Sequence, residues 1–332
     1  MTRLDHHSLR PSATSAPLRF IWSHAAVGTF LALLLSRIVH LAIAILRPPN
    51  SRPGSGCDDH ADRPGGCRSV YVISGFTNGN IVALVGSKGV LLVDGQSGRR
   101  VGLADSALRT VTKLPVQLVV NTHYHADHIE GNPHWRAQGA RIFAQRLLVG
   151  EAKKDTVITE WEEWHREAAD PAALPDSVFD DSLALPFEGH VTALHADSAH
   201  TSGDAVIWFR DANVIHTGDI VELGAPPFLD WWGGGTLDGM IRGVDLVLAH
   251  ADDKTRIVPG HGWVTNRGEV ATYRKMLVTM RERTLAAIGA GQSVEQYLAT
   301  QPTREFDQAF GGSRYGERFA RLLYVGLSRR SP

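Results

Sequence analysis

The stretch Asn121-Thr122-His123-Tyr124-His125-Ala126-Asp127-His128 comes directly after a short apolar run, residues 116–120, that is typical of a buried strand. Within this stretch, the six residues 123–128 contain three imidazoles and one carboxylate. Because side chains alternate along an extended chain, His123 and His125 are expected to point to the same side. Two neutral imidazoles this close suit a Zn²⁺-type ion, and the closing Asp-His pair, at the start of an expected helix, is placed for a second ion.

Ligand-type residues recur further along the chain, in short loops next to expected strands. These loops are Ser198-Ala199-His200-Thr201, His216-Thr217-Gly218-Asp219 and Pro259-Gly260-His261-Gly262. A polar loop that is His-rich by composition alone would not be matched by isolated His and Asp residues at several other strand ends. The pattern therefore indicates one metal site, assembled from several loops, with imidazole and carboxylate ligands.

The string His-x-His-x-Asp-His, followed in order by a His, an Asp after Thr-Gly and a His after Pro-Gly, resembles the metallo-β-lactamase superfamily over residues 70–288. The resemblance implies an α/β fold, the four-layer αββα sandwich, with the active site at one edge of its two sheets. It also implies a ligand set. The first metal would be held by His123, His125 and His200, the second by Asp127, His128 and His261, and Asp219 would bridge both.

Hydrolysis is the chemistry that this resemblance implies. Two zinc ions held by these residues would lower the pKa of a bound water toward about 7 and so supply a nucleophile for a carbonyl, phosphoryl or sulfuryl centre. Asp127 is the predicted catalytic residue, placed to orient the nucleophile or shuttle its proton. The expected cofactors are two Zn²⁺ per chain, with iron as the alternative, and the expected partner is a small-molecule substrate.

The sequence narrows the reaction without naming the substrate. Many β-lactamases of the superfamily hold the second metal with a Cys where Asp219 stands here, and both cysteines of this chain precede residue 70. The leading hypothesis is a binuclear zinc hydrolase of a small ester, thioester, lactone or lactam. The alternatives are an iron-dependent sulfur dioxygenase-type oxidoreductase, a true β-lactamase and a metal-stabilised binding module without turnover.

Two aromatic segments are candidates for contact with the substrate. The loop 226–235 combines aromatic side chains with three glycines, which gives large apolar faces on an adaptable backbone. Its aromatics are Phe228, Trp231 and Trp232. Anchoring of this loop in the core is the alternative interpretation. The turn 74–80, with Phe76, resembles a substrate-flanking hairpin of the family, and a plain β-turn is the alternative there.

Short β-rich runs and helical patterns surround these loops. The expected strands are 70–73, 80–85, 90–94, 116–120, 191–195, 205–209, 214–216 and 256–258, and the expected helices are 99–108, 150–169, 237–248 and 270–280. The clearest helix is 237–248, in which apolar residues form one stripe and Thr236 is a candidate N-cap. Two successive β-rich then α-rich halves predict one layered domain over 70–290, followed by a helical extension, 291–332.

The first 69 residues have a different character. Residues 1–56 hold six Arg and one Asp, a charge of +5, which leaves −6 for the rest of a chain whose net charge is −1. Residues 20–46 are mostly apolar and, as a helix of about 40 Å, would cross a hydrocarbon core of about 30 Å. We therefore expect a signal peptide or membrane anchor over 1–46, a Pro/Gly-rich linker over 47–69, and an exported or membrane-anchored protein, on the periplasmic side in a bacterium, rather than a cytoplasmic one.

Composition limits the partners and the redox chemistry. Near-zero net charge gives no general attraction to phosphate, so no nucleic-acid partner is expected. Sixteen His against two Cys favour imidazole over thiolate ligands. Three interpretations of Cys57 and Cys67 stay open: a short disulfide loop in an oxidising compartment, lipid attachment at Cys57, or two free thiols. The oligomeric state is open at this stage.

Overall fold

The computed structural model describes residues 42–46, 69–75, 79–159 and 161–329 of the 332-residue chain. These ranges belong to one compact unit. Most of the predicted leader, the linker with both cysteines, and Phe76 lie outside the described residues. None of the helices in the described ranges is both long and apolar enough to cross a membrane.

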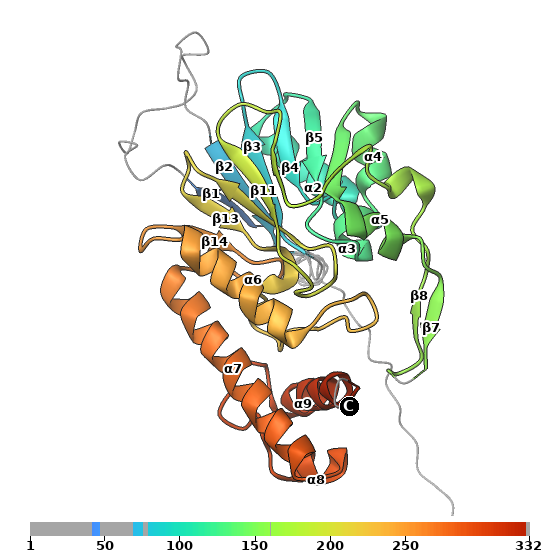
Figure 1. The fold of residues 1–332 in the computed structure, drawn as a ribbon. Helices are drawn as coiled ribbons and strands as arrows, with labels where there is room; N and C mark the ends of the chain where they lie inside the picture. The colour runs from blue at the N-terminus through green and yellow to red at the C-terminus, as the bar shows by residue number, and fades with distance from the viewer. Residues whose placement is uncertain (1–41, 47–68, 76–78, 160, 330–332) are drawn as a thin grey trace, which may run out of the picture. The chain divides into compact units, whose positions relative to one another are not determined.

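Two β-sheets form the centre of this unit (Figure 1). The first has the strand order β1-β2-β3-β4-β5-β6-β9, and its strands are β1 (Ala42–Leu46), β2 (Ser69–Ser74), β3 (Ile81–Val85), β4 (Val90–Val93), β5 (Val116–Val120), β6 (Arg141–Gln145) and β9 (Ser177–Phe179). The second has the order β10-β11-β12-β13-β14, and its strands are β10 (Ser182–Ala184), β11 (Val191–His195), β12 (Ala205–Phe209), β13 (Val214–His216) and β14 (Arg256–Val258). A separate hairpin pairs β7 (Thr156–Ile158) with β8 (Trp164–Arg166).

Helices lie outside the two sheets (Figure 1). They are α2 (Val101–Val111), α3 (Ala126–Ile129), α4 (Asn132–Ala137), α5 (Arg146–Ala152), α6 (Leu237–His250), α7 (Arg267–Gly289), α8 (Val294–Ala299) and α9 (Ser313–Ser328), with 3₁₀ turns η1 (Pro171–Ala173) and η2 (Gly218–Ile220). Thr236 caps α6 by accepting a hydrogen bond from the Gly239 amide, as predicted. Helices α8 and α9 occupy the segment after residue 290, and α9 packs against α7.

The central strands β3, β4 and β12 are mostly buried on both faces, and alternation assigns each face to its own core. Val82 and Leu84 of β3 pack between the sheets with residues of β11 and β12, whereas Ile81 and Ala83 pack against α2 and Trp135 of α4. A third core joins the outer face of the second sheet to α6, α7 and α9. The four layers are therefore helices, sheet, sheet and helices, which confirms the predicted αββα fold.

Strand direction positions the loops that carry the site. Strands β4, β5 and β6 are parallel, as are β13 and β14, so the carboxyl ends within each set lie at one edge of its sheet. Two backbone hydrogen bonds join these edges across the sandwich. The Ala205 amide donates to Thr122 O at 2.8 Å, and the Asn80 amide donates to Gly260 O at 2.7 Å.

Two segments differ from the sequence-based expectation. Residues 42–46, expected at the end of an apolar helix, form strand β1, which pairs antiparallel with β2 and covers its edge. The helix expected over 150–169 ends at Ala152, and the hairpin β7–β8 follows. The run Thr156-Val157-Ile158 explains this difference, because consecutive β-branched residues favour a strand.

Candidate metal centre

The His-rich stretch begins where the buried strand β5 ends. His125 has an extended backbone and is the N-cap of the short helix α3, which begins at Ala126. The amide of His128 donates to His125 O at 2.9 Å, which closes the first turn. This change from strand to helix directs His123 and His125 toward one cluster, and Asp127 and His128 toward a second.

The first cluster joins His123, His125, His200 and Asp219. His125 Nδ1 lies 3.1 Å from His123 Nε2 and 3.0 Å from His200 Nε2. The opposite nitrogen of each ring has a partner. His123 Nδ1 lies 3.1 Å from Thr122 Oγ1, and His200 Nδ1 donates to Phe228 O at 2.7 Å. The nitrogens that remain, His123 Nε2, His125 Nδ1 and His200 Nε2, therefore present lone pairs to one another. A cation bound between them would remove this repulsion.

The second cluster joins Asp127, His128 and His261. His261 Nε2 lies 3.3 Å from Asp127 Oδ2, and His128 Nε2 lies 3.6 Å from the same oxygen. His128 is fully buried, whereas the side chains of His261 and Asp127 are 27% and 24% exposed. The second cluster is thus the one that opens to solvent.

Asp219 borders both clusters. Its Oδ2 lies 3.7 Å from both His123 Nε2 and His200 Nε2 and 3.3 Å from His261 Nε2, and its Oδ1 lies 3.4 Å from His128 Nε2. Gly260 makes this position possible, because a Cβ there would meet Asp219 Oδ1 at 1.8 Å. The structure therefore brings all seven predicted ligand residues together, with Asp219 in the bridging place.

Burial sets the proton state of the first cluster. Desolvation and the neighbouring imidazoles hold the pKa of His123 well below its usual value. Desolvation and His125 likewise lower the pKa of His200 to about 4. Both rings are therefore neutral near pH 7, which is the form that binds a metal.

Carboxylates reverse this effect in the second cluster. Burial disfavours the charged forms, but Asp127 and Asp219 outweigh it and raise the pKa of His128 to about 10. Against the same opposition from burial, Asp219 and Asp127 raise the pKa of His261 to about 12. The pKa of Asp127 is lowered, because His128 and His261 outweigh its desolvation. Near pH 7 this cluster therefore holds carboxylates and imidazolium ions.

Two buried aspartates orient the ligands, and the sequence analysis did not single them out. Asp94, directly after β4, accepts from His128 Nδ1 at 2.8 Å and from Thr122. Asp230 lies 3.3 Å from His125 Nε2 and accepts from the Tyr124 hydroxyl. Asp94 could have been found from the sequence, because it is an Asp at the end of an apolar strand. Asp230 could not, because the residue that it contacts, His125, is 105 residues away.

The predicted substrate-binding aromatics have different places. Phe228 lies beside the first cluster, with its ring centroid 6.1 Å from that of His200. Trp231 Nε1 donates to Leu322 O of α9 at 3.0 Å, so this side chain anchors the loop. Trp232 packs against Trp161, with centroids 6.1 Å apart. Anchoring of the loop therefore describes Trp231, whereas Trp232 belongs to an aromatic group with Trp161.

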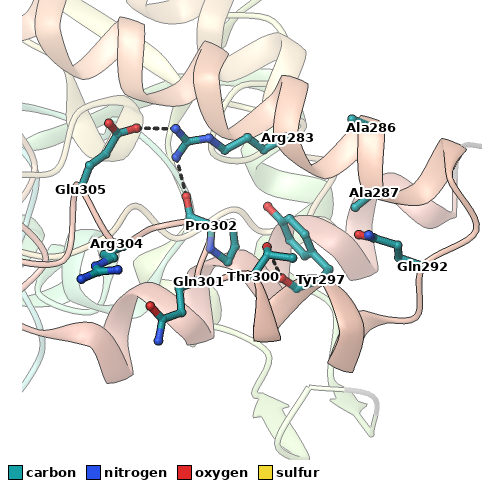
Figure 2. A pocket seen from close by; sticks show the side chains of 10 residues that line it. All are labelled: Arg283, Ala286, Ala287, Gln292, Tyr297, Thr300, Gln301, Pro302, Arg304 and Glu305. Carbon is teal, nitrogen blue, oxygen red and sulfur yellow. Dashed lines mark hydrogen bonds and ion pairs between the residues drawn. The ribbon is translucent and has the colours of Figure 1, made fainter.

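A cavity of about 840 Å³ between α7, α8 and the following loop does not include cluster residues in its lining (Figure 2). Arg283 crosses it, donating to Pro302 O and pairing with Glu305 at 2.6 Å. Tyr297 is buried and bonds to Thr284. Arg283 is thus held by Pro302 and Glu305, and we assign the chemistry to the His/Asp clusters, where the ligand-type side chains gather.

The donor set fits two metal ions. The ligand atoms within each cluster all lie within 4.8 Å of one another. His128 Nε2 and Asp219 Oδ1 are buried without a hydrogen-bond partner, which is costly unless a cation binds them. Imidazole and carboxylate donors without thiolate suit Zn²⁺ and Fe²⁺ alike.

Comparison with known proteins agrees with this geometry. The model of the family described as Metallo-beta-lactamase superfamily matches residues 74–261, more than half of the chain. This chain belongs to the metallo-beta-lactamase superfamily. The match contains every cluster residue, from His123 to His261, and the superfamily site is consistent with a metal-dependent hydrolase.

Solved structures show the same fold at low identity. A metallo-beta-lactamase from Pontibacter korlensis is 15% identical, and the match covers 71% of this chain and 98% of that one with a TM-score of 0.51. The stereoselective inverting sec-alkylsulfatase Pisa1 from Pseudomonas sp. is 17% identical, with 77% of this chain and 48% of that one covered and a TM-score of 0.58. The match spans about half of the alkylsulfatase. At these identities the likeness shows the fold alone.

Proposed function

We propose that this protein is a binuclear zinc hydrolase that cleaves a small ester, thioester, lactone or lactam. The observation that carries the proposal is the convergence of three imidazole lone pairs beside a carboxylate–imidazole cluster, with Asp219 between them. When bound, the ions would supply Lewis acidity and an activated water.

The residues of the site would have two roles, to hold the two ions and to position the attacking water. His123, His125 and His200 would hold one ion in the buried half of the centre, and Asp127, His128 and His261 the other at its solvent side. Asp127 Oδ2 accepts from the Gly79 amide at 3.3 Å, which fixes the carboxylate at the opening. Its lowered pKa keeps it ionised near neutral pH, so it can orient a nucleophilic water by accepting a hydrogen bond from it.

The direct test is a substrate panel with controlled metal content. Protein stripped by a chelator is reloaded with zinc or with ferrous iron and assayed on an aryl ester, a thioester, a lactone and a chromogenic cephalosporin. We expect zinc to restore hydrolysis of at least one of the first three substrates. Oxygen uptake with a persulfide in the iron-loaded protein, without hydrolysis of any ester, would instead support the sulfur dioxygenase alternative.

We also propose that the protein is exported or membrane-anchored through the segment before strand β1, residues 1–41, and that it binds no nucleic acid. The support for the first point is the +5 charge of the first 56 residues and the apolar stretch that begins at residue 20, and the support for the second is the charge of −6 on the rest of the chain. Fractionation of cells that express the full chain tests the first point, because a protein wholly in the cytoplasmic fraction would contradict it.

A further inference from the structure

A cavity of about 570 Å³ lies between the hairpin β7–β8, the loop after Glu222 and helix α9. Most of its wall is aromatic or proline, contributed by Trp161, Trp164, Pro226, Pro227, Phe228 and Phe319. Its charged lining groups are Glu222 and the ion pair of Glu162 with Arg318, at 2.9 Å. A concave apolar wall with few polar groups is typical of a binding site for an organic ligand.

This cavity adjoins the metal centre through two of its wall residues, Trp164 and Phe228. The ring centroids of Trp164 and Phe228 lie 6.0 and 6.2 Å from that of His125. The peptide groups of Phe228 tie the wall to both clusters. Its carbonyl accepts from His200, and its amide donates at 3.1 Å to Glu222, which pairs in a β-bridge with His261. A ligand that fills the cavity would therefore lie next to the first cluster.

The hairpin wall is held in place. Its turn contains two consecutive non-glycine residues with left-handed backbone, Glu162 at φ 54° and Glu163 at φ 51°. Such strain persists where the surroundings fix the conformation. Here Trp161 is 4% exposed and lies under Arg318 at 4.9 Å, while Arg166 of β8 donates to the Tyr124 hydroxyl at 2.9 Å. The wall is thus preformed, which lowers the entropic cost of binding.

We infer that this cavity binds an apolar chain attached to the scissile group, so that the enzyme prefers medium-chain over acetyl substrates. The inference rests on the proposed hydrolase function and names its substrate class. Full burial of each added methylene raises kcat/KM by about fourfold, provided that the chain contacts the wall in the transition state.

The experiment compares two chain-length series on zinc-loaded protein. One series varies the acyl side, from acetyl to octanoyl with one aryl leaving group, and the other varies the alkyl side of acetate esters. We expect kcat/KM to rise by at least about tenfold between the shortest and longest members of one series. The series that responds identifies which side of the scissile bond occupies the cavity.

The variant Ala225→Trp fills the cavity from an exposed position on its rim, so the core stays intact. We expect it to lower the long-to-short ratio of kcat/KM at least about tenfold with unchanged metal content. The matched control Ala137→Trp, at the exposed end of α4, leaves the ratio unchanged. Equal rates along both series, or an unchanged ratio in Ala225→Trp, overturn the inference while leaving the hydrolase in place. Absence of turnover on every ester, thioester and lactone overturns both.

Discussion

The two halves of the metal centre have ring centroids only 4.1 Å apart, between His123 and His128, yet their imidazoles differ in proton state. In the first half, the buried rings of His123 and His200 are neutral and can bind a cation directly. In the more open second half, His128 and His261 are imidazolium ions beside two carboxylates, and a metal must displace their protons. The difference teaches that similar ligands can form a preorganised site or a proton-competing one, depending on whether carboxylates surround the imidazoles.

The largest expected effect comes from removing one ligand from each half. We expect His123→Ala to lower kcat/KM by about 10³-fold or more, because several kcal/mol of electrostatic stabilisation are lost with the buried ion. His261→Ala, at the open side, should cost about 10- to 100-fold, since Asp127, His128 and Asp219 remain. Steady-state kinetics at saturating zinc measures both. Equal losses of kcat/KM in the two variants would contradict the proposed difference between the buried and the open half of the site.

The pH dependence of metal binding sharpens the comparison. The raised pKa values of His128 and His261, about 10 and 12, mean that a metal must displace their protons near neutral pH. Affinity at the second cluster therefore falls as pH falls, by about tenfold per pH unit for each proton released. The lowered pKa of His200, about 4, predicts little change at the first cluster between pH 6 and 8.

Calorimetric zinc titration of the stripped protein at pH 6, 7 and 8 measures this difference. We expect two binding events whose affinities converge as pH rises. Two events with parallel pH dependence would show that the clusters do not differ in proton state.

The smallest effects concern the two orienting aspartates. Asp230→Asn should weaken binding of the first ion by about 10- to 100-fold through His125, and Asp94→Asn should act mainly on the second ion through His128. The matched control is Asp245→Asn, which alters a surface ion pair with Arg274. Zinc affinity of each variant is the measurement. If Asp230→Asn and Asp245→Asn behave alike, Asp230 does not position His125.

Much of the fold could be predicted because its signals are local. The strand before Asn121, the stripe of α6 and its Thr236 cap each depend on a few neighbouring residues. The His-x-His-x-Asp-His string likewise predicts a metal site, because side-chain alternation pairs His123 with His125 and one helical turn pairs Asp127 with His128.

Contacts between distant segments could not be predicted in the same way. The hairpin β7–β8 depends on Trp161 packing against Trp232 and on Arg318 of α9. The role of Trp231 depends on a carbonyl of α9, 91 residues away. Sequence alone identified Trp231 and Trp232, but not which aromatic of their loop faces the metal centre, because tertiary packing decides that.

The central claim is that the two clusters form one binuclear metal centre. Its most direct measurement is the metal-to-protein ratio, by mass spectrometry of the elements, in protein purified without chelator at pH 8. We expect about two ions per chain in the wild type and about one in His261→Ala, whose first cluster is intact. Less than one-tenth of an ion per chain in a folded wild-type protein that binds no added zinc would contradict it.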